Sequence, residues 1–160
     1  MFVLGAPCSG KTTIAGRLRG TGIEVIDTDD EIVRLNGGSW PDIEMKNERL
    51  LPLVLDAAVA LDEVIVLNSY LPLASTRQLR ERGFSVALLD VSDAELRRRD
   101  AVRFAAEGWT NREWFDWHQE VIREHHDAGL IDHLIDGEQS PQRVAAALVA
   151  LLGRSRHQAP

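Results

Sequence analysis

Short apolar runs alternate with segments of helical periodicity along this chain, a pattern that predicts repeated strand–helix units. The strand-like runs are almost continuously apolar, as expected for strands that are buried on both faces. We expect five of them, at 2–4, 23–26, 64–67, 84–89 and 133–135. Strands that alternate with helices favour a parallel sheet with helices on its faces. The predicted fold is therefore α/β, a three-layer sandwich around a five-stranded parallel sheet.

Helix start and stop signals stand between these runs. Ser92 and Glu95 form a capping box that opens a helix to about residue 108, and Thr110 and Glu113 form another that opens a helix to about residue 129. Gly153 is expected just past the end of the last helix. Further helices are predicted at 13–18, 73–82 and from 140 onward. We expect one domain over 1–153 and a frayed tail at 154–160.

The loop after the first predicted strand has the sequence of a phosphate-binding P-loop. Residues 5–12 read G-x-x-x-x-G-K-[ST], the Walker A motif, between a predicted strand and a predicted helix. In such a loop the backbone N–H groups surround a phosphate at a helix N-terminus, while Lys11 reaches the β- and γ-phosphates and Thr12 binds Mg²⁺. Lys11 is one of only two lysines in the chain, so composition does not explain its position. The expected ligands are ATP and Mg²⁺, and the expected nucleotide-binding residues of the loop are Gly5, Ala6, Pro7, Cys8, Ser9, Gly10, Lys11, Thr12 and Thr13.

An acidic segment follows the second predicted strand. Ligands of open α/β sheets bind beyond the carboxyl ends of the strands, so Asp27 and Asp29 are expected to face the P-loop. Their alternate spacing would let both carboxylates project from one side of an extended segment. A phosphoryl acceptor needs a carboxylate to orient it and take its proton, and Mg²⁺ needs oxygen ligands. We expect this pair, with Thr12, to serve these needs; the alternative is an acidic cap on the next helix.

These motifs, with the run at 35–43, resemble the nucleoside-monophosphate kinase superfamily, and within it shikimate kinase and gluconate kinase are the most similar. Shikimate kinases have D-[ST]-D, a helix and then G-x-[ST]-[IV]-x-x-[IV], and the matching residues here are Asp27, Asp29, Gly38, Ser39 and Ile43. Polynucleotide kinases have a similar carboxylate at the position of Asp29 and use it as general base, which implies that catalytic role for Asp29. The resemblance covers most of the chain in the order of its elements, and its specific motifs lie in 1–43.

The resemblance fails at the positions that would bind shikimate. Shikimate kinases follow the third strand with Gly-Gly-Gly, whereas Asn68, Ser69 and Tyr70 stand here. Their hydrogen-bonding groups suit a hydroxylated or heterocyclic acceptor; the alternative is a plain polar turn. Arg49 lies about where the family has an arginine-bearing helix, and Arg34 is a further charged candidate. Shikimate is therefore not expected, and the candidate acceptor site is Asp29, Arg34, Arg49, Asn68, Ser69 and Tyr70.

An arginine-rich segment corresponds to the superfamily's lid, which closes over the phosphates, and we expect the lid at about 98–112. Arg99 and Arg103 are one helical turn apart and face the same way. Guanidinium groups can stabilise the charge that spreads over the phosphoryl oxygens during transfer. By resemblance Arg99 matches the nucleotide-stacking arginine, and Arg103 is our choice for the catalytic phosphate contact, with Arg98 in reserve. The alternative is a solvated basic helix face.

Aromatic residues recur at helical spacing just after the lid. Trp114, Trp117, Val121 and His125 form this stripe, which is more typical of a core than of a wedge that stacks on a planar substrate. The histidines nearby do not form H-E-x-x-H, so no zinc site is predicted.

Charge and composition limit the remaining choices. The net charge of −7 argues against broad binding to a nucleic-acid backbone, so a nucleic-acid partner is possible but not favoured. No apolar run reaches the length of a membrane span, and the single cysteine fits the reducing cytoplasm. We expect a cytoplasmic, monomeric ATP-dependent kinase that phosphorylates a hydroxyl or phosphate of a small nucleotide-like or polyol acceptor. The alternatives are a nucleotide-binding regulatory module without transfer, and a kinase for a nucleic-acid 5′-hydroxyl or modified base.

Overall fold

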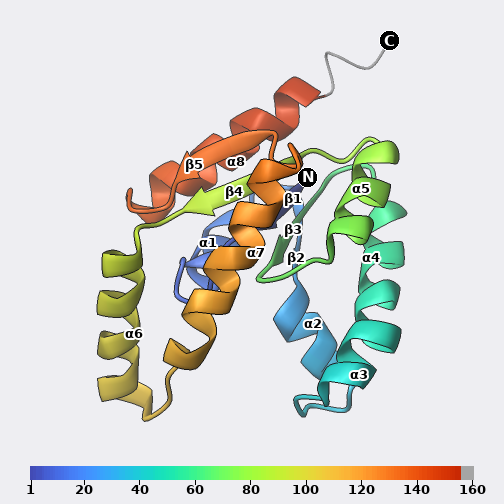
Figure 1. Cartoon of the computed structure of the whole chain (residues 1–160). Helices are drawn as coiled ribbons and strands as arrows, with labels where there is room; N and C mark the ends of the chain where they lie inside the picture. The colour runs from blue at the N-terminus through green and yellow to red at the C-terminus, as the bar shows by residue number, and fades with distance from the viewer. Residues whose placement is uncertain (156–160) are drawn as a thin grey trace.

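Five parallel strands form the centre of the structure, a computed structural model that describes residues 1–155 (Figure 1). The strands are β1 (Phe2–Leu4), β2 (Glu24–Asp27), β3 (Val64–Asn68), β4 (Val86–Asp90) and β5 (His133–Asp136). Their order across the sheet is β2-β3-β1-β4-β5, and every neighbouring pair is parallel. The predicted α/β fold with a P-loop after the first strand is confirmed.

Two cores lie on opposite faces of this sheet because alternate residues of each strand point in opposite directions. Val3 and Leu67 enter the core that is shared with α1 (Lys11–Leu18) and α8 (Pro141–Ser155). Phe2 and Val66 enter the other core, with α2 (Thr28–Leu35), α4 (Leu51–Val59) and α5 (Leu73–Glu81). The three inner strands β1, β3 and β4 are buried on both faces, which explains their continuous apolar sequence, whereas the edge strands β2 and β5 are partly exposed.

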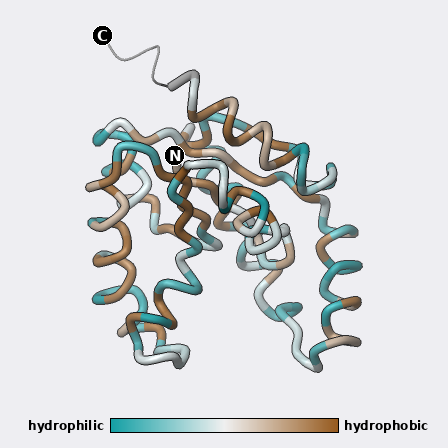
Figure 2. Tube along the Cα trace, turned by 180° about the vertical axis from the view of Figure 1, so that it is seen from behind, coloured by the Kyte–Doolittle hydropathy of each residue, from teal (hydrophilic) through white to brown (hydrophobic). Residues whose placement is uncertain are grey.

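Helices at the carboxyl edge of the sheet frame the site. On one side are α6 (Asp93–Glu107) and the start of α7 (Phe115–Asp127), and on the other are α2 and the short α3 (Ile43–Met45) (Figure 1). A small third core, which includes Leu96 and Phe115, ties α6 to α7. Figure 2 shows hydrophobic colour concentrated along the central strands, while α6 alternates between hydrophilic and hydrophobic residues. Among residues 1–155 no helix is long and apolar enough to cross a membrane.

Two local predictions are wrong, and one helical stretch was not predicted. Thr110 does not begin the predicted helix: its hydroxyl donates to Asp100 and accepts from the backbone N–H of Arg112 at 3.1 Å, and a short 3₁₀ turn, η2 (Arg112–Trp114), precedes α7. Gly153 does not end the last helix, since α8 continues to Ser155; the predicted tail at 154–160 is therefore helical at its start, and 156–160 lie outside the described residues. The helical stretch that ends in α4 was not predicted, and it includes a π-helical turn, η1 (Lys46–Leu50).

Candidate active site

The P-loop leaves β1 and closes on the N-terminus of α1. Cys8 and Gly10 have φ values of 66° and 99°, so the chain turns through left-handed conformations before the helix begins at Lys11. A Cβ on Gly5 would lie 2.5 Å from the Ser9 hydroxyl, so this position needs glycine for the loop to close. The first N–H groups of α1 have no partner within the helix, which makes this terminus a ready anion site.

Lys11 lies at the centre of this loop. Its Nζ donates to the carbonyl oxygens of Gly5 at 2.8 Å and Ala6 at 3.0 Å, and the residue is only 8% exposed. Burial lowers the pKa of Lys11 from 10.5 to about 8, although the charges of Asp29 and Asp27 oppose the change. Both carboxylates therefore lie within electrostatic reach of the lysine, as the sequence predicts.

Thr12 and Asp27 are in direct contact. The Thr12 hydroxyl donates to Asp27 Oδ2 at 3.1 Å, and Asp27 is buried at the end of β2. Burial, followed by the neighbouring charges of Asp29 and Asp30, raises the pKa of Asp27. Hydroxyl and carboxylate oxygens are suitable Mg²⁺ ligands, and here they meet beside the P-loop. The two residues therefore fit a Mg²⁺ ion that is held mainly by phosphate oxygens and water.

Asp29 reaches the site by a different route from the one expected. The segment is not extended there, because Asp27 caps α2 by accepting from the Asp29 backbone N–H at 3.2 Å, and Asp29 lies in the first helical turn. Asp29 Oδ2 nevertheless accepts a hydrogen bond from the Ser69 hydroxyl at 3.5 Å. The carboxylate thus lies between α2 and the end of β3.

The end of β3 contributes the polar residues that the sequence singled out. Asn68 is 2% exposed, and its Oδ1 accepts from the backbone N–H of Tyr70 at 3.1 Å. Its backbone carbonyl accepts from the N–H of Gly5 at 3.2 Å, which places it beside the P-loop. The Tyr70 ring packs against Trp117 of α7, with ring centroids 4.8 Å apart. Asn68, Ser69 and Tyr70 are therefore brought together with Asp29.

The two candidate arginines of the acceptor site are not brought to Asp29. Arg34 is exposed and pairs with Glu31 on its own helix. Arg49 is exposed and forms no ion pair with any residue in 1–155. Lys46 takes their place, with its Nζ 3.7 Å from Asp29 Oδ1 and 4.6 Å from the centre of the Trp40 ring. The sequence held a signal that could have identified this residue, because Lys46 is the second of only two lysines.

His118 of α7 is a second residue that sequence reasoning missed. It is 7% exposed, and burial, followed by the charges of Lys11 and Lys46, lowers its pKa to about 4. A hydrogen bond to the Ser69 backbone and the charge of Asp29 oppose this shift in pKa. The ring is therefore neutral at pH 7 and faces the P-loop and Asp29. No motif marks His118 in the sequence, and only the path of α7 reveals its position.

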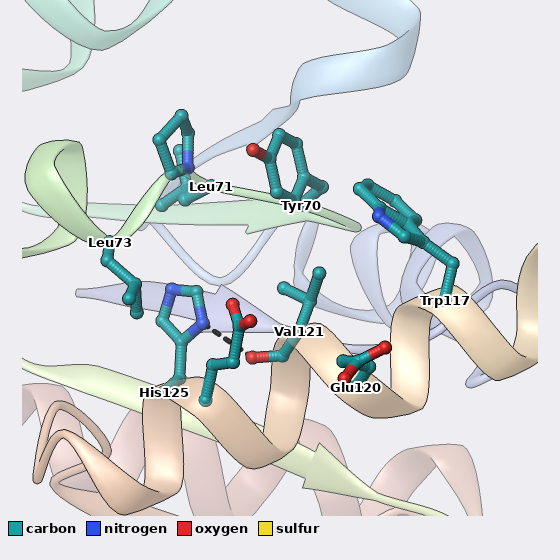
Figure 3. A pocket seen from close by; sticks show the side chains of 9 residues that line it. Tyr70, Leu71, Leu73, Trp117, Glu120, Val121 and His125 are labelled. Atoms are coloured by element: carbon teal, nitrogen blue, oxygen red, sulfur yellow. Dashed lines mark hydrogen bonds between the residues drawn. The ribbon is translucent and has the colours of Figure 1, made fainter.

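The aromatic stripe of α7 is only partly core, which corrects the favoured interpretation. Val121 and His125 are buried, but Trp114 and Trp117 are 51% and 42% exposed. Tyr70 and Trp117 form one end of a pocket of about 190 Å³ between α7 and the start of α5 (Figure 3). His125 lines the same pocket and is fully engaged, with Thr76 Oγ1 at 3.0 Å from Nε2 and the Val121 carbonyl at 2.8 Å from Nδ1.

Arg99 joins the P-loop to the loop after β5. Its guanidinium donates to the carbonyl oxygens of Ser9 at 3.1 Å and Gly137 at 3.0 Å, and it pairs with Glu95 at 2.7 Å. A Cβ on Gly137 would lie 2.5 Å from a methyl group of Val91, so this loop also approaches its neighbours closely. Arg99 therefore connects α6, the P-loop and the loop after β5.

Arg103 also reaches the P-loop, while the reserve candidate Arg98 does not. An Arg103 N–H group donates to Cys8 Sγ at 2.8 Å, and the guanidinium lies 3.9 Å from the centre of the Trp109 ring. Arg98 is exposed and pairs with Glu95. The two preferred arginines of the lid are thus the two that contact the loop.

Asp100 holds the predicted lid together from inside. It is 1% exposed and accepts from the Thr110 hydroxyl, from the backbone N–H of Asn111 at 3.0 Å and from Cys8 Sγ at 3.7 Å. Burial alone would raise the pKa of Asp100, but these hydrogen bonds and Arg103 together lower it. This buried carboxylate connects α6, the loop before α7 and the P-loop.

Comparisons with known proteins identify the fold. No protein-family model and no curated protein matches the chain. The shikimate kinase of Aquifex aeolicus has a TM-score of 0.66 and 18% identity, over 99% of this chain and 100% of that chain. The shikimate kinase of Bacteroides thetaiotaomicron has a TM-score of 0.69 and 16% identity, over 95% of this chain and 97% of that chain. A gluconokinase from Sinorhizobium meliloti 1021 has a TM-score of 0.62 and 18% identity, over 99% of this chain and 96% of that chain. The chain therefore has the fold of small P-loop kinases, including the two that its sequence resembles.

Proposed function

We propose that this chain is an ATP-dependent phosphotransferase that moves the γ-phosphate of ATP to a hydroxyl group of a small acceptor. The observation that supports this most is the meeting of Lys11, the Thr12–Asp27 pair and Asp29 at the carboxyl edge of the sheet. A protein that only binds nucleotide needs the P-loop and ligands for Mg²⁺, but it has no need for a second carboxylate, Asp29, that can take a proton from an acceptor. Residues 1–153 would act as one kinase domain, with a lid at about 98–112.

The residues around the phosphates have separable tasks in this proposal. The backbone N–H groups from Cys8 to Thr13 bind the phosphates, and Lys11 follows the charge of the migrating phosphoryl group. Arg99 and Arg103 approach the same phosphates from the lid side. When bound at Thr12 and Asp27, Mg²⁺ would offset the negative charge of the β- and γ-phosphates.

Asp29 favours a hydroxyl over a phosphate as the receiving group. A hydroxyl loses its proton on transfer, and Asp29 can orient it and take that proton. A phosphate acceptor is already ionised at neutral pH and would meet a second negative charge at Asp29. The Ser69 hydroxyl orients the carboxylate, and Lys46 balances its charge.

The test is ADP formation from ATP and Mg²⁺ with candidate acceptors, compared between the unmodified protein and Lys11→Ala. We expect the variant to lose activity by about 10³-fold or more, because one preorganised group at the transferring phosphate has an effect of this order. Arg82→Ala, which removes an exposed arginine from the end of α5, is the matched control and should keep full activity. Near-normal transfer by folded Lys11→Ala would refute the kinase assignment, and binding without transfer to any acceptor would favour a regulatory module.

A kinase for a nucleic-acid 5′-hydroxyl is the second candidate. All four tryptophans are between 42% and 55% exposed, and exposed aromatic rings can stack on the bases of single strands. The net charge of −7 opposes this candidate. A 5′-hydroxyl oligonucleotide and the matching free nucleoside, assayed side by side, distinguish the two. A strong preference for the oligonucleotide would support this second candidate.

A further inference from the structure

Three buried polar atoms around Asp29 have no hydrogen-bond partner. They are Asp29 Oδ1, Asn68 Nδ2 and His118 Nδ1, from α2, β3 and α7. Asn68 and His118 are more than nine-tenths buried, and unpaired polar atoms at such depth are rare in folded proteins. Ser69 links all three, because it follows Asn68, donates to Asp29 and bonds to His118 through its backbone. The three residues that carry these atoms therefore meet around Ser69, and each of them leaves one polar atom without a hydrogen bond.

The charges around these atoms favour an uncharged ligand. Lys46 balances Asp29, and the amide of Asn68 is neutral. The pKa of His118, at about 4, leaves its ring neutral at physiological pH. Arg34, which could have held a carboxylate or phosphate, is paired with Glu31, and Arg49 is exposed and makes no ion pair with Asp29. An anionic acceptor would meet the negative charge of Asp29, whose nearest cation, Lys46, is already paired with it, and repulsion between like charges is strong in a partly buried site.

An aromatic surface adjoins this polar cluster. Tyr70 follows Ser69 in the chain, and Trp117 precedes His118, so the ring pair lies next to the polar atoms. The two rings are tilted by 48°, and they wall the pocket between α7 and α5 (Figure 3). Trp117 also packs edge-on against the His118 ring, with centroids 4.8 Å apart. The exposed Trp117 ring and the half-buried Tyr70 ring can pack against a planar partner.

We propose that the acceptor is an uncharged, hydroxyl-bearing ring compound of the nucleoside type. Its polar edge would bind Asn68 Nδ2 and His118 Nδ1, and its flat face would lie against Tyr70 and Trp117. Its hydroxyl would meet Asp29, which accepts the proton as the oxygen forms its bond to the γ-phosphorus and the bond from that phosphorus to the ADP oxygen breaks. This inference rests on the proposed kinase function and specifies its substrate class. It assigns binding roles to Asn68 and His118.

Matched pairs of acceptors test the charge and the shape that the site prefers in its substrate. The probes are adenosine with AMP, cytidine with CMP, methyl shikimate with shikimate, and myo-inositol as an uncharged ring without a flat face. We expect nucleosides to exceed their monophosphates by at least about 100-fold in kcat/KM, and to exceed myo-inositol, because the site lacks a cation for the extra charge. A preference for AMP, CMP or shikimate overturns the inference while the kinase function stands. Absence of Lys11-dependent ADP formation with every acceptor overturns both.

Variants test the two named residues. Asn68→Asp keeps the Oδ1 that accepts from Tyr70 N–H but replaces the free donor with an acceptor. His118→Leu removes the ring nitrogen, and His118→Asn restores a polar atom near it. We expect Asn68→Asp and His118→Leu to raise the KM for the nucleoside by about 10-fold or more at an unchanged KM for ATP, with partial recovery in His118→Asn.

The control is His126→Leu, which removes an exposed histidine from the same helix and should change neither KM. A merely structural role for His118 would change both KM values together and would not be rescued by His118→Asn. An unchanged acceptor KM in both Asn68→Asp and His118→Leu overturns the inference.

Discussion

Nucleotide binding is expected to draw a proton onto Lys11. In the free protein, burial holds the pKa of this lysine at about 8, and its Nζ donates to the neutral carbonyl oxygens of Gly5 and Ala6. The displacement from 10.5 corresponds to about 3 kcal/mol against the charged form. Phosphate oxygens beside the amine favour the charged form and raise the pKa again. The complex therefore holds more protons than the free protein, and binding takes protons up.

The size of the effect follows from these values. If the phosphates restore the pKa of Lys11 to 10.5, uptake is about 0.5 proton at pH 8, about 0.9 at pH 9 and about 0.1 at pH 7. By linkage, affinity for the nucleotide falls as pH rises through 8, by about tenfold between pH 7 and pH 9. This window lies above the range in which the nucleotide phosphates themselves titrate.

Calorimetry measures this uptake directly. Titrations with ADP and Mg²⁺ in two buffers of different ionisation enthalpy give the number of protons exchanged at each pH. Lys11→Arg provides the control, because arginine stays charged throughout this range and should show no uptake at pH 8 or 9. If the unmodified protein binds nucleotide at pH 9 without taking up protons, burial does not depress the pKa of Lys11 and the reasoning is wrong.

Three further predictions concern the carboxylates and the lid. Asp29→Asn should lower kcat by about 10²-fold while the KM for ATP is little changed, because it removes the proton acceptor; loss of Mg²⁺–ATP binding instead would assign Asp29 to metal support. Asp100→Asn should destabilise the protein by about 2 kcal/mol in thermal unfolding, because its buried carboxylate holds Thr110 and Asn111, whereas exposed Asp93→Asn should have little effect. An unchanged melting temperature would contradict that role. Arg103→Ala should alter Trp109 emission and shrink the fluorescence difference between a bisubstrate analogue and ADP; equal spectra for the free, ADP-bound and analogue-bound protein, with binding confirmed by calorimetry, would show that the lid does not close here.

The P-loop and the acidic segment were predictable because their chemistry is local. The fixed spacing of Gly5, Gly10 and Lys11 within one loop indicates phosphate binding, and the strand before them is recognisable from its apolar run. We predicted that Asp29 faces the P-loop because we expected an extended segment there, but the segment is helical. Asp29 still faces the site, because the first turn of α2 continues from the end of β2.

The sequence by itself determined the five strands, most of the helices between them, the phosphate-binding loop and the carboxylates beyond β2. The tertiary structure alone decided that Lys46 and His118 meet at Asp29 while Arg34 and Arg49 do not. It also decided that the Thr110 hydroxyl donates a hydrogen bond to Asp100 instead of beginning a helix, and that Trp117 lies at the surface. Hydrophobic periodicity and helix caps depend on neighbours within a few residues, so they can be recognised along the chain. A polar residue on an amphipathic helix meets its partner only when the order of the strands brings distant elements together. No local sequence pattern shows which distant residues will meet.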